Sequence, residues 1–205
     1  MLHLASMLLL LFRIIKTKDC TGVSSRMQEM YLVVFLCRYL DLMTTFVSLY
    51  NTVMKITFIS VTAYLVYLMR YKAPIAQTYD RSVDNFPHEK FLIPPAIVLA
   101  IISSWGSIPD AVYDFSLWLE SVAILPQLLL LQRSRAVENL TSHFVAAMGA
   151  YRFFYILNWV YRYFAEDHLH WTAVLGGVVQ TGLYLDFFYY YARSKWYGQK
   201  LVLPE

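Results

Sequence analysis

The stretch VYDFSLWLESVAILPQLLLL, residues Val112–Leu131, decides the fold class of this chain. It is long enough to cross a bilayer, because a spanning helix needs about 20 mostly apolar residues. A carboxylate, Glu120, lies near its middle, where a charge costs roughly 2.5–3.5 kcal/mol on insertion scales. A membrane helix that keeps such a group normally turns it toward the interior of a helical bundle. We therefore expect a helical membrane protein with a polar interior.

The composition of the whole chain supports this class. Of its 205 residues, 59% are hydrophobic and only 15% are charged, and the mean hydropathy is +0.47. This apolar content excludes a disordered chain, and two cysteines exclude a disulfide scaffold. A net charge of +3 without a basic block argues against nucleic-acid binding. Nucleotide-binding, hydrolase and metalloprotease motifs are absent from the sequence, so we expect no enzyme activity and no cofactor.

Six further apolar segments predict a single seven-helix membrane domain over residues 1–205. They are Leu2–Ile15, Met30–Leu49, Val53–Met69, Phe91–Trp105, His143–Phe164 and Trp171–Tyr191, and residues 192–205 would form a tail. Phe91–Trp105 is the weakest, because it is short and contains Pro94-Pro95 near its start. We interpret Leu2–Phe12 as a retained first helix, since no basic residue precedes it and no small-x-small cleavage site follows it.

The positive charges predict the orientation of these segments. Of the 17 Lys and Arg residues, 13 fall after the first, third, fifth and seventh segments, and only Lys55 and Arg162 fall on the opposite side. Because cytoplasmic loops carry the excess of Lys and Arg, these 13 residues predict a cytosolic C-terminus and a lumenal N-terminus.

Several ionisable side chains lie within the predicted spans: Arg38, Asp41, Glu120, Arg152 and Asp186. The residues Arg152, Tyr155, Trp159 and Arg162 recur at helical spacing, so they share one face of a helix. Arginine forks suit carboxylates, and the face therefore favours a cavity for an anionic, peptidic or carboxylate ligand. The alternative is a structural ion-pair network, in which Arg38–Asp41 and Arg152–Glu120 only hold helices together.

Two histidine-containing features bear on a pH switch and on metal binding. His3 enters a bundle that contains Glu120 and Tyr151, and a histidine can change its charge between pH 5 and 8. A buried histidine of this kind could act as a pH switch. The run Glu166–His170, EDHLH, does not have the spacing of a common metal site, so we expect no bound metal.

Motifs spread over the whole chain resemble one receptor family. They are RYLDL at residues 38–42, SLYNT at 48–52, WLESVAILPQ at 118–127, YR at 151–152, NW at 158–159, VQT at 179–181 and DFFYY at 186–190. In this order they resemble the ER lumen protein-retaining receptors, or KDEL receptors. The resemblance implies an all-α, seven-transmembrane fold of the PQ-loop type, related to the SWEET transporters, with two three-helix bundles joined by Phe91–Trp105.

The resemblance also implies a function and a set of residue roles. The receptor would bind KDEL/HDEL-type C-terminal tetrapeptides of escaped ER residents in the mildly acidic Golgi and return them to the ER with the COPI coat. Arg38 and Tyr39 would take the terminal carboxylate, Trp159 and Arg162 an upstream acidic side chain, with Tyr155 on the same helix face, and Asp110 and Tyr113 the first, cationic residue. His3, Glu120 and Tyr151 would form the pH lock. Asp41, Arg152, Asn158 and Asp186 would support it, and Lys195 and Lys200 would meet the coat.

The sequence alone leaves two other function classes open. The first is a transporter of small anionic solutes on the same fold, in which the buried arginines would contact the substrate. The second is a structural assembly protein with internal ion pairs. Peptide binding and solute flux distinguish these alternatives from a receptor.

Overall fold

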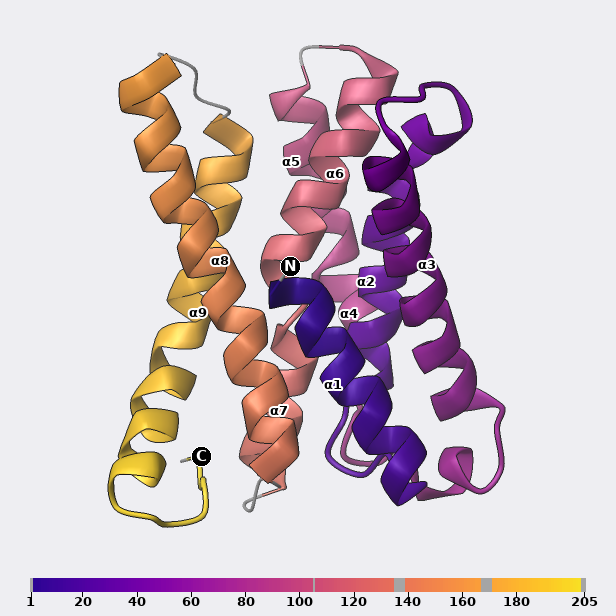
Figure 1. The fold of residues 1–205 in the computed structure, drawn as a ribbon, viewed down its shortest axis with the longest axis vertical. Coiled ribbons are helices and arrows are strands. Elements are labelled where there is room, and N and C mark those ends of the chain that lie inside the picture. Colours follow the sequence, from indigo (N-terminus) through magenta and orange to yellow (C-terminus); the bar gives the residue numbers. More distant parts are fainter. Residues whose placement is uncertain (1, 105, 135–138, 167–170, 204–205) are drawn as a thin grey trace.

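The chain folds into a bundle of helices (Figure 1). The computed structural model describes residues 2–104, 106–134, 139–166 and 171–203, and 79% of the chain is helical. The α-helices are α1 (Leu2–Thr17), α2 (Ser25–Arg38), α3 (Leu49–Arg70), α4 (His88–Phe91), α5 (Ile93–Ser103), α6 (Ile108–Val122), α7 (Leu125–Arg133), α8 (Asn139–Glu166) and α9 (Trp171–Trp196). Two short 3₁₀ helices are η1 (Leu40–Met43) and η2 (Ile75–Thr78). The described ranges contain no strand, which confirms the predicted all-α class.

The predicted segment Val112–Leu131 is interrupted between α6 and α7. Pro126 lies in the first turn of α7, and the carbonyl four residues before it belongs to Val122, the last residue of α6. Because proline has no backbone N–H and its ring clashes with that carbonyl, a continuous helix is disfavoured there. With α4–α5 and α6–α7 each counted as one interrupted helix, the described helices number seven.

The predicted segment Met30–Leu49 is not one helix, and this expectation was wrong. Helix α2 begins earlier, because Ser24 caps it by accepting the Met27 N–H at 3.2 Å. It ends at Arg38, and a second serine cap, Ser48, accepting the Asn51 N–H at 3.2 Å, starts α3. Serine caps satisfy the unpaired N–H groups of a first turn, so they fix where a helix begins. Asp41 consequently lies in η1, beyond the end of α2.

The last two helices are longer than their predicted segments. Helix α8 extends beyond His143–Phe164 at both ends, and α9 continues past Tyr191 to Trp196. The segment expected as a tail, residues 192–205, therefore begins within α9. Beyond that helix, Leu201 and Leu203 are buried against the core.

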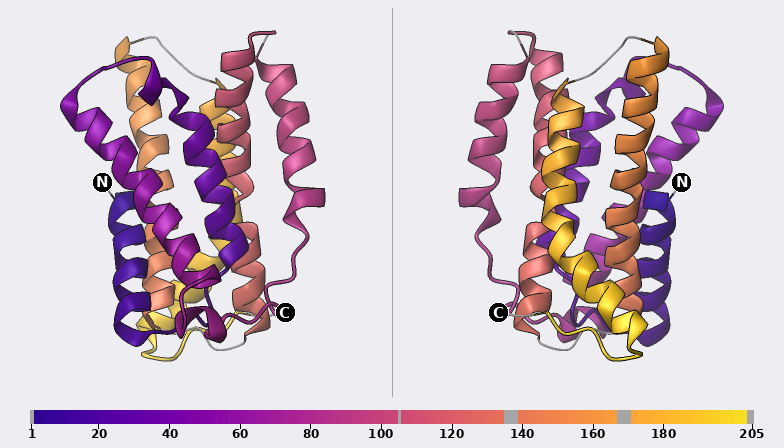
Figure 2. Two further views of the ribbon diagram at one scale, coloured as in Figure 1. Left: turned by 90° about the vertical axis from the view of Figure 1, so that its right-hand side faces the viewer. Right: turned by 90° about the vertical axis from the view of Figure 1, so that its left-hand side faces the viewer.

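The helix packing places α6 at the centre of the bundle. Helix α6 contacts α2, α5 and α9, while α1 contacts α8 and α3. Figure 2 shows α5 on the outside of α6, where Ile101 and Ile102 are exposed. Exposed apolar surface on this scale is typical of a lipid-facing side. Within the described ranges, Leu49–Arg70 and Ile108–Arg133 are by themselves long and apolar enough to cross a membrane.

The end of the bundle at which α1 connects to α2 is held by a glutamine. The side chain of Gln127, beside Pro126, accepts the Ser24 N–H and donates to the Gly22 carbonyl, each at 2.8 Å. Gly22 has a φ of 78°, in the left-handed region that glycine adopts without steric cost. These two bonds fasten α7 to the start of α2.

A buried carboxylate strengthens the same end. Asp84, only 1% exposed, accepts hydrogen bonds from the hydroxyl groups of Ser24 at 2.9 Å and Tyr79 at 2.6 Å. Burial and the bond to Asp84 raise the pKa of Tyr79, so its hydroxyl stays protonated and donates. The loop before α4 is thereby fixed to the cap of α2.

Candidate functional site

A cavity of about 1110 Å³ lies at the other end of the bundle, where η1 connects α2 to α3. We call this the α2–α3 end, and the end with Gln127 the α1–α2 end. Side chains from α1, α2, α3, α6 and α8 line the cavity. The lining brings together these residues singled out in the sequence: His3, Arg38, Tyr39, Tyr113, Glu120, Tyr151, Arg152, Tyr155, Asn158, Trp159 and Arg162. Segments far apart in the chain thus build one polar cavity.

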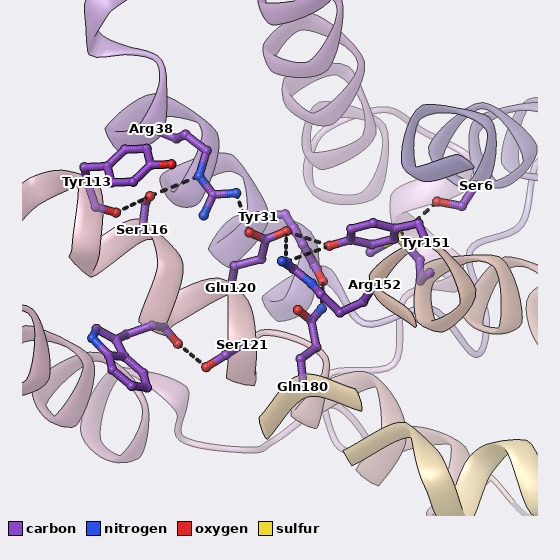
Figure 3. Close-up of polar contacts among 12 residues, drawn as sticks. Ser6, Tyr31, Arg38, Tyr113, Ser116, Glu120, Ser121, Tyr151, Arg152 and Gln180 are labelled. Carbon is purple, nitrogen blue, oxygen red and sulfur yellow. Dashed lines mark hydrogen bonds and ion pairs between the residues drawn. The ribbon is translucent and has the colours of Figure 1, made fainter. Parts of the chain in front are cut away.

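Glu120 is the centre of the polar contacts in this cavity (Figure 3). One carboxylate oxygen, Oε2, pairs with Arg38, and the other, Oε1, lies 2.5 Å from Arg152. The Tyr151 hydroxyl also donates to Oε1 at 2.6 Å. Glu120 is 2% exposed, and such a buried charge is tolerable only when it is paired and hydrogen-bonded. One carboxylate therefore serves two guanidinium groups, which leaves this cluster with a positive charge.

Arg38 has one donor without a hydrogen-bond partner among the residues that the structure describes. Its Nε donates to Ser116 Oγ at 3.1 Å and its Nη1 to Glu120, whereas Nη2 is buried without a hydrogen-bond partner. Ser116 in turn donates to the Tyr113 carbonyl at 2.6 Å, which fixes its position on α6 (Figure 3). Because leaving a charged donor buried and unpaired is costly, Nη2 is suited to an incoming carboxylate oxygen.

His3 lies among aromatic rings, 8% exposed. It stacks on Tyr151 with ring centroids 4.3 Å apart and an interplanar angle of 5°. The rings of Tyr31 and Phe35 from α2 and Phe58 from α3 lie 5.4–5.5 Å away. Within the described part of the chain, His3 Nε2 has no hydrogen-bond partner. His3 is thus one ring away from Glu120, since Tyr151 contacts both groups.

The predicted aromatic and cationic face of α8 is present. Tyr155 lies 6.0 Å from Tyr151 and 5.9 Å from Trp159, measured between ring centroids. Gly177 on α9 provides the space for Trp159, because a Cβ at that position would lie 2.5 Å from the indole ring. The face therefore depends on a close approach between α8 and α9.

Five predicted carboxylate and lysine positions lie outside the cavity, and one of them is Asp41 in η1. Asp110 is exposed at the start of α6, and Asp186 is exposed on α9 rather than inside the bundle as expected. Both Lys195 and Lys200 are exposed near the C-terminal end. The placement of Asp186 was predicted wrongly because α9 turns Tyr184 and Phe187 inward, and residue 186 falls on the other side of the helix.

The alternative of a purely structural ion-pair network is half correct. The Arg152–Glu120 pair is present. The Arg38–Asp41 pair was wrong, because Arg38 turns to Glu120, and Asp41 Oδ2 lies 2.5 Å from Lys55 Nζ. The change follows from the end of α2 at Arg38, which removes the helical spacing on which that pair depended. The run Glu166–His170, considered as a metal site, has side chains outside the described residues.

The contribution of α3 to the cavity was missed in the sequence. Asn51, Lys55 and Phe58 all line the cavity. They are spaced at i, i+4 and i+7, which puts them on one face of a helix. The sequence signal for this face is the helical spacing of the three residues, in a helix whose single lysine is Lys55.

These features define a class, a helical bundle with exposed apolar outer faces and a cationic cavity suited to an anionic ligand. The sequence comparisons identify the family. A family model described as ER lumen protein retaining receptor matches residues 19–162. The chain is 59% identical to the ER lumen protein-retaining receptor of Plasmodium falciparum, over 99% of this chain and 93% of that protein. It is 49% identical to that of Petunia hybrida (100% and 95% covered) and 46% identical to that of Drosophila melanogaster (98% and 94% covered). The chain belongs to the ER lumen protein-retaining receptor family, a family of receptors by name.

Proposed function

We propose that this chain is a pH-dependent sorting receptor for C-terminal tetrapeptides of the KDEL/HDEL type. It would bind escaped ER residents in the Golgi and return them to the ER by retrograde COPI vesicles. The observation that carries the proposal is the unpaired Nη2 of Arg38 in a cavity where one carboxylate serves two arginines. A terminal carboxylate supplies the missing acceptor. The names of the relatives, which are receptors that retain ER lumen proteins, agree with this assignment.

The residues that would bind the peptide form three groups, each for a different part of the tetrapeptide. Arg38 and the adjacent Tyr39 would hold the terminal carboxylate. Trp159 and Arg162, with Tyr155 beside them, would contact an acidic side chain further upstream. All five residues line the same cavity.

The first residue of the tetrapeptide is cationic, and Tyr113 and Asp110 would bind it. Tyr113 lines the cavity and Asp110 is three residues earlier on the same helix, so both lie on one side of α6. Asp110 is exposed, and it would therefore attract the cation from solvent rather than bury it.

The pH dependence would come from His3. The groups that face it are Tyr151 from α8, Tyr31 and Phe35 from α2, and Phe58 from α3, with the Glu120–Arg152–Arg38 cluster behind Tyr151. A protonated His3 would be attracted to Glu120 and repelled by the two arginines. A ligand carboxylate on Arg38 removes part of that repulsion, so the loaded cavity holds the proton more tightly. By linkage, ligand affinity then rises as pH falls.

The test of this switch is a binding measurement at two pH values. A peptide ending in HDEL is titrated into the purified receptor at about pH 6 and about pH 7.4, which bracket an ordinary histidine. We expect about tenfold tighter binding at the lower pH, because a shift of one pKa unit corresponds to that factor. His3→Ala should reduce the ratio of the two affinities toward one. The control His143→Ala, at the α1–α2 end, should leave this ratio unchanged. Equal affinities of the unaltered receptor at both pH values would show that the switch is absent.

The same proposal includes the orientation of the chain in the membrane, the arrangement of its helices and the lysines that would bind the COPI coat. The α2–α3 end would face the lumen, with the N-terminus lumenal and the C-terminus cytosolic in ER and Golgi membranes. The single domain would have a 3+1+3 arrangement with α5 as the linker, and the peripheral packing of α5 on α6 supports this. Lys195 and Lys200 would meet COPI, and both are exposed.

Transport of a small anionic solute is the alternative on the same fold. It predicts uptake of a labelled solute into proteoliposomes that is lost in Arg38→Ala. A receptor predicts peptide binding without uptake. The two measurements on one preparation therefore separate the two functions.

A further inference from the structure

The loop that connects α2 to α3 exposes large apolar side chains. We call it the α2–α3 loop; it comprises residues 39–48, includes η1 and projects from the bundle at the α2–α3 end (Figure 1). Met43 is 89% exposed and Phe46 is 75% exposed. The other large side chains exposed in this loop and in the first turn of α3 are Leu40, Val47, Leu49 and Tyr50. An apolar patch of this kind marks a surface that contacts another apolar phase or partner.

The sequence around this patch carries no charge. Residues 42–54 contain no Asp, Glu, Lys or Arg. Asp41 and Lys55, which border this stretch, pair with each other. Protein interfaces surround their apolar core with a polar rim, whereas a lipid surface takes Leu, Phe and other apolar side chains without one. The composition of the loop therefore favours lipid.

The patch continues into the outward side of α3. Exposed residues recur along this helix every three or four residues, which puts them on one face. From the patch to the α1–α2 end they are Leu49, Val53, Ile56, Ser60, Tyr64, Tyr67 and Tyr71. Because α3 is long and apolar enough to cross a membrane, this face is the one that contacts lipid, and the α2–α3 loop extends it.

The length of α3 sets the depth of the loop in the bilayer. At the α1–α2 end, the rings of Tyr64, Tyr67 and Tyr71 stack with centroids 6.2–6.3 Å apart. Tyrosine is enriched where the hydrocarbon meets the headgroups. The 22 residues of α3 rise about 33 Å, close to the thickness of about 30 Å of the hydrocarbon core. With the tyrosines at one interface, the α2–α3 loop lies at the other.

The backbone of the loop restricts it to that interface. The N–H groups of Thr44 and Thr45 donate to the Asp41 carbonyl at 3.1 and 2.8 Å, but residues 45–48 have no regular secondary structure. An irregular backbone cannot enter hydrocarbon, where no water satisfies its polar groups. Apolar side chains on a segment at the surface still reach about 5–10 Å into the boundary between headgroups and acyl chains.

We propose that the α2–α3 loop is a membrane anchor, which inserts Met43, Phe46 and Val47 into the headgroup–acyl boundary of the leaflet at the α2–α3 end. The other side of the loop is part of the cavity wall, since Tyr39 at its start and Ser48 at its end line the cavity. The lipid surface thereby holds this wall in place. This role requires only that α3 crosses a membrane, so it does not depend on the tetrapeptide.

The test is the depth of a fluorescent label on the loop. In the full chain with Cys20→Ser and Cys37→Ser, an environment-sensitive nitrobenzoxadiazole label is attached to Phe46→Cys. The protein is placed in phosphatidylcholine nanodiscs, one chain per disc. Its emission should be blue-shifted relative to the same label on Asp110→Cys, an exposed position at the same end, and iodide should quench it several-fold less. Equal emission and equal iodide quenching at the two positions would place the loop in water and overturn the anchor.

Two further positions sharpen the measurement. Ser60→Cys, on the exposed face of α3 near its middle, should be quenched most by lipids that carry a nitroxide deep in the acyl chain. Phe46→Cys should be quenched most by a nitroxide near the headgroup, and a deep profile like that of Ser60→Cys would overturn the interfacial position. Met43→Cys should behave as Phe46→Cys does, and it replaces that variant if the latter does not fold. Shielding of the label only after a folded cargo protein is added would assign the loop to cargo and overturn the anchor.

Discussion

The two ends of the bundle use buried polar groups in different ways. At the α1–α2 end, Asp84 and Gln127 hydrogen-bond to neighbouring loops and helix starts, and the side chain of each has at least two partners. At the α2–α3 end, Glu120 serves two arginines, and among the described residues a nitrogen of Arg38 and one of His3 have no partner. The α1–α2 end also has an unpaired buried atom, Thr141 Oγ1, but Thr141 does not line the cavity, whereas Arg38 and His3 do. Satisfied groups stabilise a structure, and a group that remains unpaired is a candidate for ligand binding. We therefore propose that one end holds the helices together and that the other end, where the unpaired groups line the cavity, receives a ligand.

The largest effect on this comparison is expected from the removal of Arg38, whose Nη2 has no partner among the described residues. Arg38→Ala should weaken tetrapeptide binding by about hundredfold or more, because a buried carboxylate would lose its charged partner. Arg38→Lys should restore only part of the affinity, since lysine keeps the charge but not the planar fork. The measurement is calorimetric titration of a peptide ending in HDEL, with the exposed Arg193→Ala as the matched control. Near-normal binding by Arg38→Ala would contradict the role assigned to that end.

A second test addresses the opposite end. Asp84→Ala should lower the free energy of unfolding by about 2–4 kcal/mol, because the Ser24 and Tyr79 hydroxyl groups would lose a buried acceptor. The ligand affinity of the protein that remains folded should be unchanged. Thermal unfolding in detergent measures the effect. The control is Asp80→Ala in the same loop, an exposed carboxylate whose loss should change stability much less. Comparable losses for the two variants would show that Asp84 does not hold this end.

A smaller effect is expected from the helix contact behind Trp159. Gly177→Ala would place a methyl group 2.5 Å from the indole ring and push it toward the cavity. Peptide affinity should then fall by about three- to tenfold, a shift of roughly 1 kcal/mol. Gly182→Ala on the same helix meets no atom within 4 Å and serves as the control. Peptide titration against both variants measures the difference. An equal effect of the two would mean that Gly177 has no special part in positioning Trp159.

The sequence predicted the features that depend on spacing within one helix. The α8 face of Arg152, Tyr155, Trp159 and Arg162 follows from the 3.6-residue period alone, and all four residues line the cavity. The inward turn of Glu120 follows from the cost of a charge in hydrocarbon. The grouping of the other cavity residues, and their roles, came from the resemblance to a known family.

The sequence did not predict the features that depend on where a helix ends. Residues 38–41 fit a continuous helix by composition, and only the serine caps at Ser24 and Ser48 reveal the shorter α2. The partner of Lys55 depends on that end, because Asp41 lies in η1 rather than on the face of Arg38. The outward position of Asp186 depends on the rotation of α9, which its neighbours Tyr184 and Phe187 determine by packing inward.

The most direct test of the account is to remove the charge from the end of the ligand. Two peptides ending in HDEL, one with a free carboxylate and one with a C-terminal amide, are titrated at about pH 6. If Arg38 Nη2 binds the terminal carboxylate, the amide should bind the unaltered receptor about hundredfold more weakly than the acid. The Arg38→Ala variant should bind both peptides with the same low affinity. Equal affinities of the unaltered receptor for the acid and the amide would contradict the account.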